Sequence, residues 1–226
     1  MNLYFTFEEY TDEIEILSFP VEPLDVNCTV LNDKKAQEAV VVDPGGNIDE
    51  ILSLIDKTGS KVSAILFTHA HFDHCMHAQE LIEKTKSSLK ISAMHPEDFD
   101  WLQNLSQLAL QFGITADVKP PEISHKLIHG ENLKIGCFQI QVIHSPGHSR
   151  GSVSFYLQSH NLVIAGDTLF KGSVGRTDLK GGDFAVLKDS VMNKLYKLPD
   201  DTRVITGHGP YTTIVQEKKE NSFFRG

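Results

Sequence analysis

A cluster of histidines directly after an apolar segment limits the fold of this chain more than any other feature. Residues 62–67 predict a buried strand, and the next seven residues read Thr-His-Ala-His-Phe-Asp-His, ending at His74. Residues i and i+2 of an extended chain face the same side, so His69 and His71 can converge on one point. Asp73 and His74 follow in a turn and can reach a neighbouring point. The spacing favours a metal site over the other interpretation, a polar helix start capped by Asp73.

Three further donors also stand just after predicted strands. His148, Asp167 and His208 each have glycine or proline beside them, which lets the backbone approach an ion closely and fixes a tight turn. Loops at one edge of a sheet are where sites are commonly built. Because the donors are spread from residue 69 to residue 208, we expect one domain over residues 1–226 that brings them together.

The number of donors predicts two metal ions. A catalytic zinc normally takes three protein ligands and leaves one position open for water. Five histidines and two aspartates are too many for one ion, and they divide into two triads plus a bridging group. We therefore expect two divalent ions about 3.5–4 Å apart. Zinc is the expected metal, and iron and manganese also suit histidine and aspartate ligands.

Short β-branched runs alternate with helical patterns along the rest of the chain. The expected strands are 14–18, 26–31, 39–42, 62–67, 89–93, 123–128, 133–135, 138–143, 153–157, 162–165 and 203–206. The expected helices are 48–57, which Asn47 can cap, 76–86, 97–112, 183–196 and 213–220, and residues 171–182 form a glycine-rich loop. This order predicts an α+β fold in which two sheets pack together with helices outside.

Composition limits the partners and the compartment. Thirty acidic residues against 21 basic ones give a net charge of −9, whereas nucleic-acid binders usually carry a basic face. No stretch approaches the ~18–20 apolar residues of a membrane span, and the first ten residues lack the basic region of a secretory signal. Three widely spaced cysteines suggest no disulfide framework. We expect a cytoplasmic protein that acts on a small molecule, without nucleic-acid or membrane partners; nothing in the sequence predicts its oligomeric state.

The order of these residues resembles the metallo-β-lactamase superfamily. The matching positions are Asp43, His69-x-His71-x-Asp73-His74, His148, Asp167 and His208. The resemblance implies an αββα sandwich, with two mixed β-sheets, helices on the outer faces and a site at one edge between the sheets. It also implies that His69, His71 and His148 bind the first metal. Asp73, His74 and His208 would then bind the second, with Asp167 bridging the two.

Within that superfamily the chain looks most similar to the glyoxalase II-like hydrolases, particularly the short single-domain bacterial type. The segments that carry this similarity are 42–46, 144–148, 169–178 and 207–210. Only 18 residues follow His208, so we expect the C-terminal helical domain of larger glyoxalase II enzymes to be absent. The resemblance implies hydrolysis of a thioester similar to S-D-lactoylglutathione, by a hydroxide that bridges the two metals. Asp73 is the expected catalytic residue, because it would position that hydroxide.

Two other reactions fit the same resemblance. Persulfide dioxygenases share the superfamily fold and carry a Gly-Arg-Thr-Asp stretch like residues 175–178. They use one iron, bound by two histidines and an aspartate. Lactone hydrolysis would use the same hydroxide as thioester hydrolysis. The context of His208 in residues 207–210 favours a hydrolase over the dioxygenase.

Four more residues have expected roles around the metals. Asp43 and His144 could each orient a ligating histidine through its other ring nitrogen. The competing interpretations are a plain turn aspartate before Pro44 and a satisfied histidine near the core. Lys171 and Arg176 lie in or beside the glycine-rich loop and are candidates for contact with an anionic substrate. For Arg176 an internal pair with Asp178 that braces the loop is the competing interpretation.

Overall fold

The computed structural model describes residues 4–111, 113–114 and 118–225. Its strands are β1 (Phe7–Tyr10), β2 (Ile14–Val21), β3 (Val26–Asp33), β4 (Glu38–Val42), β5 (Lys61–Leu66), β6 (Ile91–Met94), β7 (His125–Lys126), β8 (Asn132–Ile135), β9 (Phe138–His144), β10 (Val153–Leu157), β11 (Leu162–Gly166), β12 (Leu169–Phe170), β13 (Ser173–Val174), β14 (Arg203–Thr206) and β15 (Thr212–Thr213). Its helices are α1 (Ile48–Asp56), α2 (Phe72–Cys75), α3 (Ala78–Thr85), α4 (Phe99–Leu102), α5 (Leu105–Gln111), α6 (Phe184–Asn193) and α7 (Ile214–Glu220). Short 3-10 turns are η1 (Pro96–Asp98), η2 (Gln158–His160) and η3 (Leu195–Lys197).

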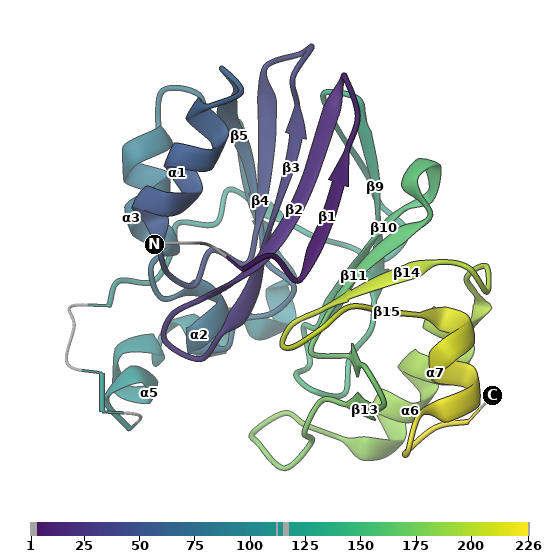
Figure 1. Ribbon diagram of the computed structural model, residues 1–226. Helices are drawn as coiled ribbons and strands as arrows, with labels where there is room; N and C mark the ends of the chain where they lie inside the picture. Colours follow the sequence, from purple (N-terminus) through teal and green to yellow (C-terminus); the bar gives the residue numbers. More distant parts are fainter. Residues whose placement is uncertain (1–3, 112, 115–117, 226) are drawn as a thin grey trace.

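Two mixed sheets form the centre of the molecule (Figure 1). The first runs in chain order from β1 to β7, antiparallel up to β4 and parallel from β4 onward. The second has the order β15-β14-β11-β10-β9-β8. Its one parallel pair in the described part of the chain is β11 with β14. A small hairpin of β12 and β13 stands apart from both sheets.

Three apolar cores separate four layers. The core between the sheets contains, among others, Ile16, Leu31, Leu66, Phe138 and Phe155. On the outer face of the first sheet, α1 and α3 contribute to a second core, and on the outer face of the second sheet, α6 and α7 contribute to a third. Figure 1 shows these helices on opposite outer sides of the two sheets. The expected α+β fold, an αββα sandwich of two mixed sheets, is confirmed.

Some local expectations were wrong. Asn47 begins α1 in a left-handed conformation (φ 53°) and makes no cap, because its side chain accepts a hydrogen bond from the Glu22 N–H at 2.9 Å instead. The helix expected over 97–112 is divided into η1, α4 and α5, and residue 112 lies outside the described residues. Strand β1 was not anticipated. None of the helices in the described ranges is long and apolar enough to cross a membrane.

Candidate metal centre

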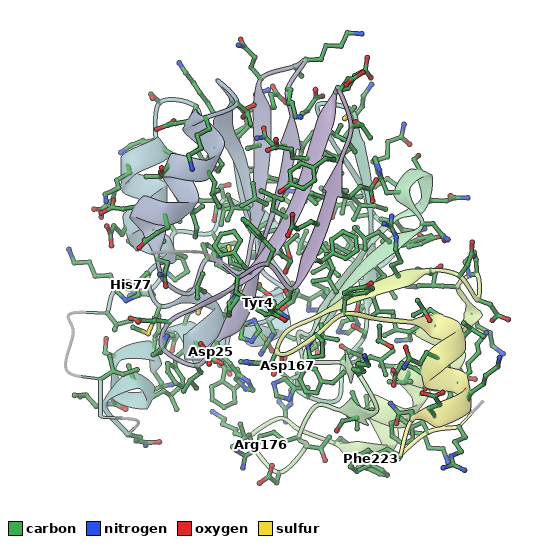
Figure 2. All side chains as sticks on the ribbon, viewed as in Figure 1. Tyr4, Asp25, His77, Asp167, Arg176 and Phe223 are labelled. Carbon is green, nitrogen blue, oxygen red and sulfur yellow. The ribbon has the colours of Figure 1, made fainter. Side chains whose placement is uncertain are left out.

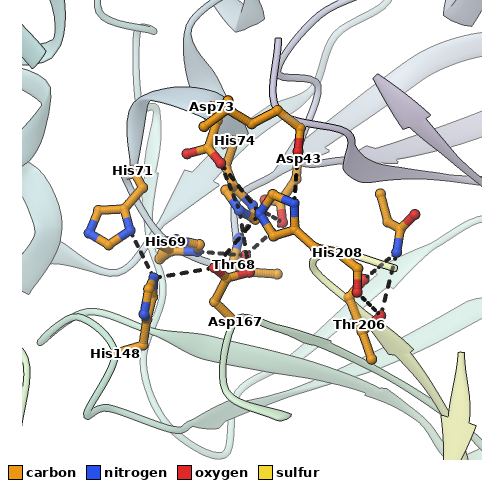
Figure 3. Close-up of polar contacts among 12 residues, drawn as sticks. Asp43, Thr68, His69, His71, Asp73, His74, His148, Asp167, Thr206 and His208 are labelled. Carbon is orange, nitrogen blue, oxygen red and sulfur yellow. Dashed lines mark hydrogen bonds and ion pairs between the residues drawn. The ribbon is translucent and has the colours of Figure 1, made fainter. Parts of the chain in front are cut away.

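Strand ends from both sheets meet at one edge of the sandwich. His69 and His71 follow β5, and α2 then begins and carries Asp73 and His74. The second sheet supplies the other three donors, His148 from the β9–β10 loop, Asp167 after β11 and His208 after β14. Figure 3 shows the seven side chains gathered around one space. In Figure 2, Asp167 is labelled in the lower middle of the molecule. The structure therefore brings together all seven donors expected from the sequence.

The donor atoms fall into overlapping groups of three. His69, His71 and His148 form one group, and Asp73, His74 and His208 form another, each with its donor atoms within 4.8 Å of one another. Asp167 lies between them. Its Oδ2 is 3.4 Å from His148 Nε2, and its Oδ1 is 3.4 Å from His74 Nε2. This is the position that a carboxylate bridging two ions needs.

Most of these imidazoles are fixed through the ring nitrogen that faces away from the group. His148 Nδ1 lies 2.8 Å from the Arg176 carbonyl, and His208 Nδ1 lies 3.0 Å from the Leu24 carbonyl. The carboxylate of Asp43 is 2.9 Å from His74 Nδ1. An imidazole that donates its proton from Nδ1 has a lone pair on Nε2, so these contacts select the tautomer that binds a metal.

Several buried atoms of the group have no hydrogen-bond partner. They are His69 Nε2, His71 Nε2, His74 Nε2 and Asp167 Oδ1. An unpaired polar atom in a protein interior costs free energy, and natural proteins rarely leave such atoms together. Coordination of a cation would satisfy His69 Nε2, His74 Nε2 and Asp167 Oδ1, whereas His71 turns its other ring nitrogen, Nδ1, toward His148 Nε2 at 2.8 Å. The residues present therefore fit divalent ions held by histidine and aspartate.

Burial and mutual charge shift the pKa values of the group in opposite directions. Burial, with help from neighbouring histidines, lowers the pKa of His69 well below its usual value and that of His71 to about 3. Burial alone would raise the pKa of Asp73, but the nearby His74 and His208 outweigh it and lower that pKa. Asp167 responds in the same way to His74. For His74 and His208, burial alone would lower the pKa, but the carboxylates of Asp167 and Asp73 outweigh it and raise both pKa values. Metals bind ionised carboxylates and neutral imidazoles, so an ion would displace a proton from His74 and His208.

Glycine is required where the backbone closes around Asp167. A Cβ at Gly207 would lie 2.0 Å from Asp167 Oδ1, and one at Gly175 would lie 1.9 Å from the Asp167 carbonyl oxygen. A side chain at Gly207 would displace the carboxylate and one at Gly175 the Asp167 backbone, so the glycine beside His208 in the sequence has a steric reason.

Asp43 lies beneath the site and contacts three groups. Its carboxylate accepts hydrogen bonds from the Thr68 N–H at 2.8 Å and the Thr68 hydroxyl at 2.6 Å, and it contacts His74. His144, by contrast, is not brought to the ligands. Its ring stacks on His95 with centroids 4.1 Å apart, and its Nε2 faces the Arg150 carbonyl at 2.9 Å. The role expected for His144 is therefore wrong: the Pro146–Gly147 turn carries the chain away from it before His148.

The two cations expected near a substrate differ in their surroundings. The guanidinium of Arg176 forms a two-bond pair with Asp178, at 2.7 Å each, and is exposed. Lys171 is exposed beside Phe170, whose ring lies 6.2 Å from that of His208.

The backbone carbonyls of Arg176 and Leu24, which hold ligand histidines, have no sequence signature. Thr68 could have been noticed, since a hydroxyl directly before His69 is visible in the sequence.

Comparison with known proteins places this centre in a family. The family model described as the metallo-beta-lactamase superfamily matches residues 21–208. The hydroxyacylglutathione hydrolase GloC of Haemophilus influenzae is 35% identical, over 93% of this chain and 97% of its own length. A crystal structure of BLEG-1, described as a B3 metallo-beta-lactamase, is 37% identical with a TM-score of 0.83, covering 92% of this chain and 99% of that one. TTHA1623, solved in a di-iron-bound form, is 36% identical with a TM-score of 0.79, covering 91% and 98%. With a family match over most of its length and relatives of at least 35% identity, this chain belongs to the metallo-β-lactamase superfamily and is a metal-dependent hydrolase of that group.

Proposed function

We propose that the protein hydrolyses a glutathione-derived thioester of the S-D-lactoylglutathione type. The observation that carries this proposal is the position of Asp167 between two groups of three donors, an arrangement suited to two ions acting on one carbonyl group. Similarity to GloC over nearly the whole chain supports the hydroxyacylglutathione substrate. The three free cysteines support a cytoplasmic location.

The proposed chemistry divides between the ions and the chain. Two divalent ions would polarise the substrate carbonyl and lower the pKa of an attacking water toward neutrality. His69, His71 and His148 would hold one ion, Asp73, His74 and His208 the other, and Asp167 both. Asp73 stays ionised because His74 and His208 lower its pKa, so it can also accept a hydrogen bond from the attacking water and fix its orientation. The leaving thiol has a pKa of about 8.5, so it departs as a thiolate without strong acid assistance.

Zinc is the proposed metal, with iron and manganese as alternatives. Histidine and aspartate ligands do not discriminate sharply among these ions, and TTHA1623 has been solved with two irons. For the anionic part of the substrate we favour Lys171 over Arg176, because the guanidinium of Arg176 is already engaged by Asp178.

The test is metal content and turnover of S-D-lactoylglutathione on one sample. Wild type should bind two ions per chain and hydrolyse the thioester, and His71→Ala and Asp167→Ala should lose metal and turnover together. His77→Asn is the matched control, since His77 is a half-buried histidine near the same segment that pairs with Glu80 and not with the donors. Full two-metal occupancy without thioester hydrolysis would reject the proposed substrate.

Two observations justify other substrates in the same assay. The Gly175–Asp178 stretch resembles that of persulfide dioxygenases, so oxygen uptake with glutathione persulfide should be measured on iron-loaded protein. BLEG-1 is described as a β-lactamase, so a β-lactam and a simple lactone belong in the panel. We expect the thioester to be turned over with the highest kcat/KM of these compounds.

A further inference from the structure

A buried aspartate outside the seven donors connects the two loops of the first proposed metal triad. Asp98 ends η1, just before α4, and its side chain is fully buried. Its Oδ2 accepts a hydrogen bond from the Ala70 N–H at 3.1 Å and from the Ser149 hydroxyl at 2.7 Å. Its Oδ1 accepts one from the Gly151 N–H at 2.6 Å.

These contacts lie next to the ligands themselves. Ala70 separates His69 from His71, and Ser149 directly follows His148. One carboxylate therefore joins the loop after β5 in the first sheet to the β9–β10 loop in the second. The approach is close, since a Cβ at Gly151 would lie 2.6 Å from the Asp98 carboxyl carbon.

Asp98 and Asp43 support the centre from different positions. Asp43 contacts His74 of the second triad and also Thr68, whose hydroxyl lies 3.1 Å from His69 Nδ1, so its contacts reach both triads. Within the described residues, the side-chain hydrogen bonds of Asp98 reach only segments that carry the first triad. We propose that Asp98 is the positioning residue of the first metal site, holding the His69–His71 segment and His148 at the separation that one ion requires. This inference rests on the proposed metal centre and is independent of the substrate.

Asp33 provides a matched comparison. It is also buried and also accepts three hydrogen bonds, in its case all from backbone N–H groups: those of Lys35 at 3.0 Å, Ala36 at 2.8 Å and Cys137 at 2.8 Å. It lies at the far end of β3 from Val26, which bridges His208. Replacing Asp33 by Asn therefore removes a buried carboxylate that accepts three hydrogen bonds, as Asp98→Asn does, but at a place away from the metal centre.

The experiment is zinc titration of metal-free protein against a competing chromophoric chelator. Asp98→Asn keeps the side-chain volume but replaces one accepting oxygen by an amide NH2 group. That group then faces a backbone N–H or a hydroxyl that also donates, so a hydrogen bond is lost. Partners that hold metal ligands typically change affinity by about 10–100-fold when they are mutated. We expect Asp98→Asn to weaken one of the two zinc sites by that factor and Asp33→Asn to weaken neither. Unchanged affinity in Asp98→Asn, or equal weakening in Asp33→Asn, would overturn the assignment.

Two further variants identify the site and guard against misfolding. In a His208→Ala background, where the first triad alone is intact, Asp98→Asn should weaken the remaining ion; in a His148→Ala background it should not. If Asp98→Asn fails to fold, Ser149→Ala removes one of the three hydrogen bonds, and it should weaken the same site by a smaller factor; unchanged binding there would contradict the proposal. The measured quantity here is zinc affinity. A protein that binds two ions but does not hydrolyse the thioester would therefore reject the proposed substrate without affecting this test of Asp98.

Discussion

Histidine serves two different purposes in this molecule. The five histidines of the metal centre lie around an enclosed space with inward-facing nitrogens. His95 and His144 instead stack face to face, with an angle of 11° between their rings, at the ends of β6 and β9. His95, Glu97 and His144 bring donor atoms within 4.8 Å of one another, but His95 Nδ1 accepts a hydrogen bond from the Glu97 N–H and His144 Nε2 faces the Arg150 carbonyl. The stacked pair fills the gap between the two sheets beside the metal centre.

The stacked pair makes stability depend on pH. Burial and the adjacent His144 lower the pKa of His95 to about 4, whereas an unfolded histidine titrates near ~6.5. Between pH 6.5 and 4 the unfolded chain therefore binds a proton that the folded chain does not, and the free energy of unfolding falls as the pH falls. For metal-free protein, His95→Phe should reduce this slope by up to about 1.4 kcal/mol per pH unit, measured by urea unfolding.

The control for that prediction is His77→Phe, at a half-buried histidine outside the stacked pair. It should leave the pH slope of the wild type unchanged. Parallel slopes for wild type and His95→Phe would show that His95 titrates normally in the folded protein.

At the scale of elements, α4 and α5 form a wall beside the metal centre. Trp101 of α4 packs edge-on against His71, with ring centroids 4.7 Å apart. Beyond it lies a cavity of about 310 Å³ whose lining includes Trp101, Leu108 and Lys180. An indole next to a proposed ligand, with apolar and cationic groups farther out, suits the thiol half of an anionic thioester.

Removing the indole should weaken substrate binding more than chemistry. Burying a large apolar side chain contributes roughly 1.5–3 kcal/mol, and about 1.4 kcal/mol corresponds to a factor of ten. Trp101→Ala should therefore raise KM for S-D-lactoylglutathione about tenfold and change kcat less. Leu110→Ala, at an exposed position of α5, should leave both constants unchanged. A fall in kcat with unchanged KM would place Trp101 outside the substrate site.

The sequence predicted the donors of the centre better than their supports. His69 and His71 follow from strand periodicity, and Asp167 and His208 from glycine-flanked strand ends, because those signals are local. Asp98 has no local signal. Its role depends on the backbone N–H groups of Ala70 and Gly151, which lie 28 and 53 residues away in the sequence. The helical pattern that follows is interrupted between α4 and α5, where the Asn104 N–H donates to the Trp101 carbonyl and closes a turn.

For the whole molecule, the apolar cores and the metal centre are separate sources of stability. The three cores are built from aliphatic and aromatic side chains of all four layers, and the burial of these side chains needs no ion. The sandwich should therefore remain folded without metal. Ions that bind only the folded state nevertheless stabilise it, by about 4.1 kcal/mol for one ion at a thousand times its Kd.

Chelation should consequently lower the Tm without unfolding the protein. In a domain of 150–250 residues 1 kcal/mol shifts the Tm by about 2–4 °C, so loss of one such ion should lower it by roughly 8–16 °C. Calorimetry with and without chelator measures this shift, and far-UV circular dichroism at 25 °C should stay unchanged. A His71→Ala/His208→Ala variant, which lacks a ligand of each triad, should show no chelator-dependent shift. Loss of the β-sheet signal on chelation would instead mean that the two sheets need the ions to pack, because the acidic and imidazole groups between their ends cannot stay buried without them.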